Sequence, residues 1–325
     1  MIFILLACSS QPLGVDYNDQ TLTVVDLHLH NGEWENFPSG TQSFLANNFP
    51  FPFSLDAETT ASSSLSTPGI LEQLDQGGVQ YGVLLAVYAP RTVGVATNEM
   101  IQERVSQAPD RLWGMASLSV EDWGEAGEAS LAALETALAA PEMIGIKLAH
   151  THMHKRMDDE RYFDIYEIAE RTRSPVYVHT GPSFFPGARI EPAYTDPRYL
   201  EAAISAYPGA DFILGHACYD FIEEDIDELD TCFELLSRHD NVWLEISALG
   251  NGEERADKYR EVIRRIREEG FVGRTLYGSD GPQRPGFVAG YLETTIDAMQ
   301  AAGYSTEEAS AVLSGNFAAL YGMSL

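Results

Sequence analysis

Lysine is scarce in this chain, and so is positive charge in general. Only Lys147, Lys155 and Lys258 are lysines among 325 residues, and Lys and Arg together number 20 against 49 acidic residues, for a formal net charge of −29. Such a surface repels nucleic acid and anionic membranes, so we expect neither as a partner. The same surface keeps a protein soluble at high ionic strength, although a composition bias without functional meaning explains the charge as well.

The scarcity makes one lysine informative. Lys147 lies inside the apolar segment Ile144–Leu148, where burial of an amine is costly unless the amine has a partner. We therefore expect Lys147 to be functional or paired.

Cysteines are few as well. Cys8 ends an apolar run that starts at Met1, and this segment resembles the lipobox of bacterial lipoproteins, in which the cysteine is lipidated. It predicts a leader and tether over residues 1–20 and an extracytoplasmic protein held at the membrane only through a lipid anchor; a short disordered leader on a cytoplasmic enzyme is the alternative. With Cys8 lipidated, Cys218 and Cys232 remain, either as a disulfide or, more simply, as buried thiols or one thiol near the site.

Short apolar runs recur along the rest of the chain with helical patterns between them. Their centres lie near residues 25, 84, 114, 146, 177, 213, 244 and 277. Apart from the first, the gaps are close to the roughly 30 residues that one strand and helix of a closed barrel require. This predicts an α/β fold, a (β/α)₈ TIM barrel, over residues 21–325 as a single domain; a doubly wound open sheet is the alternative.

The long first gap contains an insertion at about residues 31–67. It is rich in phenylalanine, proline and serine and has little periodicity. Loops after barrel strands cover the active site, so this segment is a candidate lid. The alternative is that its rings pack on the barrel rim for their own stability, and we expect only one or two to reach a substrate.

Ionisable residues follow several of these runs directly. His28 and His30 alternate on the first strand and so point to the same side, while His179, His216 and Asp280 end or follow later strands. In a barrel the carboxyl ends of the strands converge on one site.

Three imidazoles and a carboxylate suit a divalent metal. We predict that His28, His30, His179 and Asp280 bind one ion, best Zn²⁺, with Mn²⁺ or Fe²⁺ as alternatives. Such an ion lowers the pKa of a bound water to about 7. Asp280 would also accept the proton of that water, and His216 would assist beside the metal.

Several segments resemble the amidohydrolase-related family, a branch of the amidohydrolase superfamily. The resemblance runs from about Val24 to Gly322 and rests on His28–His30, Gly145–Leu148, Val178–Gly181, Leu214–Ala217, Tyr277–Pro282 and Gly315–Gly322. It implies a distorted (β/α)₈ barrel, a divalent metal that is usually zinc, and hydrolysis of C–N or C–O bonds, with non-oxidative decarboxylation in some relatives. It also implies the ligand set given above, with His216 as the second catalytic group.

The remaining candidates have less defined roles. The resemblance places Lys147 where some branches carry a carbamylated, metal-bridging lysine; we favour an unmodified lysine that contacts substrate or Asp280. Glu245 would support the metal site by hydrogen bonds or pair with Lys147. A second alternating set, His150, His152 and His154, follows the fourth strand. The alternative is that one of them reaches the site, but we expect all three to face solvent in a rim loop.

Three functions fit these residues. The first is a metal-dependent hydrolase of a small amide, ester or lactone, and the second is a metal-dependent decarboxylase of an aromatic or unsaturated acid. Arg189 and Arg284 could hold a substrate carboxylate in either. The third, a lipoprotein that keeps the barrel only for binding, has no need of four metal ligands. A small molecule is the expected partner, and assembly into a homodimer is left open.

Overall fold

The computed structural model describes residues 13–220, 222–223, 228–249 and 256–325. One parallel sheet of eight strands carries the fold, and its neighbours follow chain order. The strands are β3 (Val25–Leu29), β4 (Tyr81–Leu85), β7 (Leu112–Ala116), β8 (Met143–Leu148), β9 (Val176–His179), β10 (Phe212–Gly215), β11 (Val242–Glu245) and β12 (Thr275–Leu276).

The two ends of this sheet meet. The Leu27 amide donates to the Tyr277 carbonyl at 3.1 Å, and the Asp280 amide donates to the His28 carbonyl at the same distance. The sheet is therefore a closed barrel, which confirms the predicted (β/α)₈ fold, and the open-sheet alternative is wrong. All eight predicted strand centres fall within or one residue beyond an observed strand.

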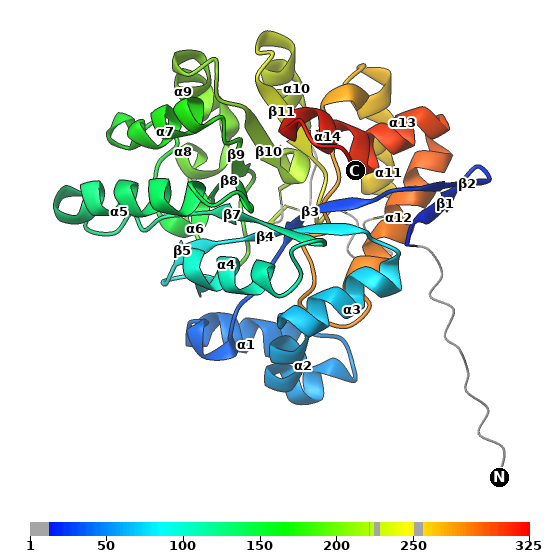
Figure 1. The fold of residues 1–325 in the computed structure, drawn as a ribbon, viewed down its shortest axis with the longest axis horizontal. Coiled ribbons are helices and arrows are strands. Elements are labelled where there is room, and N and C mark those ends of the chain that lie inside the picture. Colours follow the sequence, from blue (N-terminus) through cyan, green and yellow to red (C-terminus); the bar gives the residue numbers. More distant parts are fainter. Residues whose placement is uncertain (1–12, 221, 224–227, 250–255) are drawn as a thin grey trace.

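Helices surround the barrel (Figure 1). The principal ones are α3 (Thr67–Gly77), α4 (Asn98–Ser106), α5 (Trp123–Leu138), α7 (Asp164–Thr172), α9 (Glu201–Ala206), α10 (Leu229–Arg238), α11 (Ala256–Glu268) and α12 (Phe287–Ala301). In α11, Tyr259, Val262, Ile263 and Ile266 are buried, a spacing that turns one stripe of the helix toward the strands.

The barrel interior is apolar below the site. Inward side chains such as Val25, Val83, Met115 and Ile213 form a cluster that includes Phe317 of α14 (Asn316–Tyr321). The Phe317 ring lies 5.5 Å from the ring of Trp113, so the C-terminal segment, which also contains α13 (Thr306–Ser310) and the π-helical turn at Ala311–Gly315, closes the amino end of the strands. The polar residues lie at the opposite end, where the carboxyl ends of the strands meet.

The insertion forms two helices, α1 (Ser39–Asn48) and α2 (Ala57–Ser64), with short 3₁₀ turns η1 (Trp34–Asn36) and η2 (Phe53–Asp56). Figure 1 shows α1 and α2 side by side beneath α3, at one edge of the molecule. They have a small core of their own, to which Leu45, Phe49 and Leu65 belong. Most of the aromatic rings of the insertion therefore serve its own packing, as the second alternative expected.

Smaller elements complete the chain. A hairpin of β5 (Val87–Ala89) and β6 (Gly94–Ala96) follows β4, and the short helices α6 (His150–Met153) and α8 (Pro192–Thr195) follow β8 and β9. Further 3₁₀ turns are η3 (Glu160–Tyr162), η4 (Pro197–Leu200), η5 (His216–Cys218) and η7 (Val272–Arg274).

An amino-terminal hairpin joins β1 (Val15–Tyr17) to β2 (Gln20–Leu22). Tyr17 is buried and its hydroxyl donates to the Tyr304 carbonyl at 2.9 Å, so residues 15–20, which the sequence placed in a tether, belong to the folded body. Cys8 lies outside the described residues. Within the described ranges, no helix has the length and apolar composition needed to cross a bilayer.

Candidate metal centre

The predicted ligands meet at the carboxyl end of the barrel. His28 Nε2 lies 3.2 Å and His30 Nε2 lies 2.9 Å from the same oxygen, Asp280 Oδ1. On the other side, His216 Nε2 lies 3.0 Å from His179 Nδ1. The structure thus brings together all five residues proposed as ligands or catalytic groups.

A tighter set stands out within these five. One donor atom from each of His28, His216 and Asp280 lies within 4.8 Å of the others. The sequence placed His216 beside the ion and not in its ligand set, so the geometry leaves His216 two roles, as a ligand or as a neighbour of the ligands.

Three residues behind the ligands fix the orientation of the imidazoles. Tyr177 Oη and Ser247 Oγ both donate to Glu245 Oε2, at 2.7 and 3.0 Å. Each hydroxyl has one proton, so toward a ring nitrogen each can only accept. His28 Nδ1 lies 2.8 Å from Tyr177 Oη and 3.0 Å from Ser247 Oγ, and His216 Nδ1 lies 2.9 Å from Ser247 Oγ. Both rings therefore carry their proton on Nδ1 and present the Nε2 lone pair.

The fit to a metal follows from that arrangement. His28 Nε2 is buried and makes no hydrogen bond within the described part of the chain, although a carboxylate oxygen lies 3.2 Å away. Buried polar atoms without a hydrogen bond are uncommon in folded proteins. Neutral imidazole nitrogens beside one carboxylate are the donors that zinc prefers, so these residues fit a divalent ion of that class.

Burial sets the protonation states. Desolvation holds the pKa of His28 and of His179 well below the usual value and lowers that of His216 to about 4, so all three rings are neutral at pH 7. For Asp280, burial raises the pKa, but the hydrogen bond from His30 and the electrostatic interactions with His30 and Lys147 outweigh it and leave the pKa below its usual value. Asp280 is accordingly ionised, as both a ligand and a base must be.

Two glycines make room for this network. A Cβ at Gly215 would lie 2.1 Å from the Tyr177 hydroxyl, and a Cβ at Gly278 would lie 2.2 Å from Glu245 Oε1. No side chain fits at either place. Gly215 directly precedes His216 and Gly278 lies two residues before Asp280, so these glycines let Tyr177 and Glu245 approach the segments that carry the site residues.

Asp26 supports the closure of the barrel beneath the site. Its Oδ1 accepts from the His28 amide at 3.1 Å and from the Ser279 amide at 2.9 Å. It thereby ties the first strand to the segment that carries Asp280. Complete burial raises the pKa of Asp26 to about 7, against the lowering effect of these hydrogen bonds.

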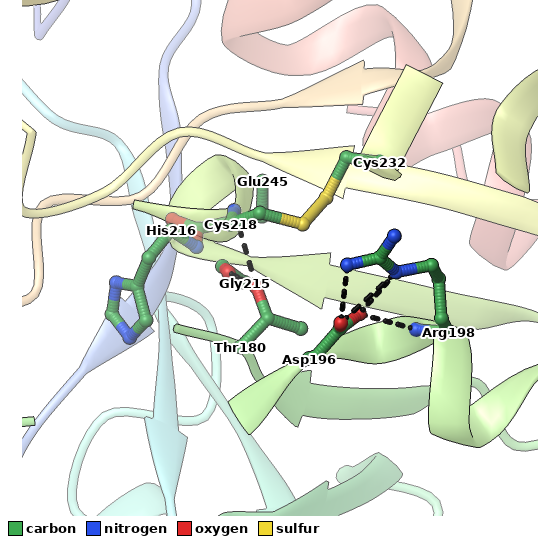
Figure 2. Close-up of a disulfide and its surroundings, with 8 residues drawn as sticks. All are labelled: Thr180, Asp196, Arg198, Gly215, His216, Cys218, Cys232 and Glu245. Carbon is green, nitrogen blue, oxygen red and sulfur yellow. Dashed lines mark hydrogen bonds and ion pairs between the residues drawn. A yellow bond between two sulfur atoms is a disulfide. The ribbon is translucent and has the colours of Figure 1, made fainter. Parts of the chain in front are cut away.

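A disulfide holds the turn that carries His216. Cys218 and Cys232 are bonded, so the thiols that the sequence favoured are wrong and the pair it also allowed is correct. His216, Ala217 and Cys218 have φ values of 61°, 48° and 61°, a left-handed run that side chains with a Cβ disfavour. Figure 2 shows the disulfide next to Thr180, which accepts from the Cys218 amide and donates to the Gly215 carbonyl, while the His216 ring points away from the sulfur atoms.

Lys147 is buried at the floor of the site. Its Nζ lies 3.8 Å above the centre of the Tyr177 ring. Desolvation lowers the pKa of Lys147, although the charges of Asp280 and Glu245 oppose that change. The Tyr177 ring is thus a partner of this lysine, and its contact with substrate or Asp280 stays a prediction. Glu245 takes the expected supporting position through hydrogen bonds.

The three histidines after β8 differ from expectation. His150 and His152 are buried, and only His154 is partly exposed, so the solvent-facing loop is wrong for two of them. The reason is that α6 turns the segment inward. The His152 ring packs edge-on against His179 with centroids 5.1 Å apart, and desolvation lowers the pKa of His152 to about 3.

The two predicted carboxylate-binding arginines lie elsewhere. Arg189 is exposed, with Nη1 3.8 Å from Glu191 Oε1, and the Arg284 guanidinium lies over the Phe287 ring. Neither contributes to the lining of the pocket.

A pocket of about 120 Å³ opens above the ligands. Its floor is formed by the four histidines of the site with Lys147, His152 and Asp280. Above them the lining is mainly apolar, and Phe37, Thr41 and Leu45 of the insertion take part in it. The arrangement is a buried polar floor under an apolar enclosure.

The sequence analysis gave no role to Tyr177, Ser247 and Asp26, and it did not single out His152 within the set His150, His152 and His154. Period-two alternation could have found the first two, because Tyr177 precedes His179 by two residues and Ser247 follows Glu245 by two. Asp26 likewise precedes His28 by two. Nothing in the sequence distinguishes His152 from its neighbours, since only the short helix α6 brings it to the pocket.

The family follows from sequence comparison. The amidohydrolase family model matches residues 62–323. The chain belongs to the amidohydrolase family. This confirms the resemblance, and family members bind a metal. The match begins after His28 and His30, so the assignment of these two histidines to the site rests on their distances to Asp280. No curated protein matches the chain significantly by sequence.

Solved structures of this superfamily share the fold. A probable 2-pyrone-4,6-dicarboxylic acid hydrolase from Acinetobacter baumannii with citric acid bound has a TM-score of 0.62 at 18% identity, over 93% of this chain and 100% of that one. A 2,6-dihydroxybenzoate decarboxylase from Rhizobium has 0.63 at 15%, over 93% and 99%. An amidohydrolase from Burkholderia multivorans with bound zinc has 0.63 at 10%, over 93% and 100%. These neighbours include hydrolases and decarboxylases alike.

Proposed function

We propose that this amidohydrolase-family chain is a metal-dependent hydrolase that adds water across a C–N or C–O bond of a small amide, ester or lactone. The observation that carries the proposal is the ionised carboxylate of Asp280 between two neutral imidazoles at the base of a pocket. A divalent ion held by His28, His30, His179 and Asp280, most simply Zn²⁺, would lower the pKa of a water to about 7.

The chain's own residues would divide the remaining work. Asp280, exposed by 22% toward the pocket, takes the proton of the attacking water. His216, with its Nε2 lone pair directed into the site, accepts a hydrogen bond from the attacking water. Tyr177, Ser247 and Glu245 keep His28 and His216 in the required tautomer.

The metal is tested on the protein as purified without chelator. Elemental analysis should find about one zinc-class ion per chain. Its absence would overturn the mechanism, and two ions together with a carbamylated Lys147 would replace it with a binuclear one. Assay against lactones, amides and carboxylic acids, with release of acid and of CO₂ followed separately, decides between hydrolysis and decarboxylation.

We also propose that Cys8 anchors the protein outside the cytoplasm. The support is the apolar run before Cys8 that ends in a small residue and the cysteine. In a lipoprotein-processing bacterium, with an adequate leader upstream, the protein should fractionate with membranes and Cys8→Ser should release it, because bacterial lipidation adds more than one acyl chain. Equal solubility of both would leave the segment as a plain leader.

A further inference from the structure

The walls of the pocket are made of apolar side chains from three separate elements. Leu45 and Leu65 come from the insertion and its end, Val93 and Val95 from the turn and second strand of the β5–β6 hairpin, and Phe184 and Phe185 from the loop after β9. The Phe184 ring stacks on Phe44 of α1 with centroids 5.2 Å apart, which joins the insertion to that loop.

Positive charge is confined to the floor. Among the described residues that line the pocket, Lys147 is the sole lysine or arginine, and its Nζ lies over the Tyr177 ring beside two carboxylates. The nearby arginines are directed elsewhere: Arg91 pairs with Glu121 at 2.8 Å, and Arg104 donates to the carbonyls of Gly32 and Leu65. A substrate carboxylate in the apolar part would thus be desolvated without a partner, which is costly.

The volume of the pocket, which is open on one side, indicates the size of apolar group that it holds. Its volume of about 120 Å³ is close to that of an apolar cavity, about 150 Å³, that accepts one benzene molecule. A group of about six carbon atoms therefore fills it. The net charge of −29 adds a general repulsion of anions.

Resting on the hydrolytic function above, we propose that the substrate is an uncharged ester, lactone or amide with one apolar acyl group of about six carbon atoms, and not a di- or tricarboxylate. In the reaction the water oxygen bonds to the acyl carbon, the acyl C–O or C–N bond breaks, and the proton taken by Asp280 ends on the leaving oxygen or nitrogen. The products are a carboxylic acid and an alcohol or amine.

A matched pair of substrates tests the proposal. 4-Nitrophenyl hexanoate and mono-4-nitrophenyl adipate have acyl chains of equal length and differ in a terminal methyl or carboxylate group. The hexanoate should have a kcat/KM at least about 10-fold higher. An equal or higher kcat/KM for the adipate would overturn the inference.

A binding experiment separates this inference from the hydrolytic function. 2-Heptanone and 6-oxoheptanoate are not hydrolysed, and their binding to the protein as purified can be measured by calorimetry. Tighter binding of 2-heptanone without cleavage of either ester would leave the pocket inference standing and overturn hydrolysis. If 6-oxoheptanoate binds as tightly, or if neither ketone binds, the inference is wrong whatever the turnover.

A charge-introducing variant sharpens the test. Val95→Lys places an amine in the wall and should reverse the preference, raising the affinity for 6-oxoheptanoate and lowering that for 2-heptanone. Misfolding cannot produce a reversal, because it would weaken both. The control is Val272→Lys, at the amino end of the barrel in η7, which should leave the preference unchanged. Failure of Val95→Lys to shift the preference would place the apolar group away from the hairpin.

Discussion

The floor and the walls of the pocket are built in opposite ways. On the floor, Glu245 Oε2 alone accepts from Tyr177, Ser247 and the His216 amide, and the same two hydroxyls accept from the rings of His28 and His216. Each of these groups is buried and depends on the next. The walls are made of aliphatic and aromatic side chains, such as Leu65, Phe184 and Phe185, and the rings of the last two stack on each other.

This difference separates chemistry from selection. Hydrogen-bond networks fix ring tautomers and angles, which a metal ligand requires, and the loss of one partner leaves others unsatisfied. Apolar contacts depend on area and volume and tolerate change. We therefore expect substitutions on the floor to change turnover and metal content, and substitutions in the walls to change substrate affinity.

The largest effect is expected for Asp280→Asn. The amide keeps the size of the side chain but removes the charge and the base, so turnover should fall by more than about 10⁴ and metal content should drop. Elemental analysis with circular dichroism checks this on folded protein. Full metal content with substantial turnover would contradict the assignment of Asp280.

His216→Asn should have the next largest effect. Turnover should fall by about 10²–10⁴, as for loss of one general acid/base or oxyanion group, while the metal content stays close to wild type. The comparison is with His28→Asn, which should lose the ion. If both variants lose it equally, His216 is a ligand, as the tight set with His28 and Asp280 allows, and the catalytic role assigned to it beside the ion is wrong.

The sequence predicted the floor far better than the walls. His28, His30, His179, His216 and Asp280 follow apolar strands, and parallel strands in a barrel must end on one side, so their convergence needs no knowledge of side-chain packing. Tyr177 and Ser247 were not predicted, although each lies two residues from a predicted site residue on the same side of its strand.

The walls could not be predicted in this way. They come from the insertion, the β5–β6 hairpin and the loop after β9, whose positions depend on contacts between segments far apart in the chain, such as Phe44 with Phe184. The burial of His152 has the same origin, since it follows from where α6 docks. The left-handed run at 216–218 contains no glycine, so the sequence does not indicate it. The sequence also could not distinguish the disulfide at Cys218 from two free thiols.

A substitution in the hydrogen-bond network behind the ligands tests whether that network contributes to metal affinity. Ser247→Ala removes the hydroxyl that contacts His28, His216 and Glu245, and should weaken metal affinity by about 10- to 100-fold. Competition with a chromophoric chelator measures this. Ser183→Ala, in the wall of the same pocket, is the matched control and should keep wild-type affinity. Equal metal affinities for the two variants would mean that the hydrogen bonds of Ser247 are not needed to orient the ligands.

Removal of the disulfide should affect stability more than chemistry. The two cysteines are 14 residues apart, so the double variant Cys218→Ser/Cys232→Ser should lose about 3 kcal/mol of unfolding free energy. Because Thr180 still holds both the Gly215 carbonyl and the Cys218 amide, turnover should fall by less than about 10-fold, well short of the His216→Asn effect. Denaturant unfolding and kinetics on the same samples compare the two. A loss of turnover as large as that of His216→Asn would mean that the disulfide is needed to position His216 for the reaction.

The smallest effect is expected in the walls, for Phe184→Ala. The Phe184 side chain is 43% exposed, so its removal should cost about 1 kcal/mol of apolar contact with substrate and raise KM about 5-fold. The kcat should not change, since a contact made equally in the ground and transition states affects binding alone. Phe51→Ala, 79% exposed in the insertion and outside the pocket lining, is the control and should match wild type. Steady-state kinetics with 4-nitrophenyl hexanoate separates the two parameters. If kcat falls as far as KM rises, Phe184 helps to place the reacting carbon against the floor, and the division between a floor that reacts and walls that select would be wrong.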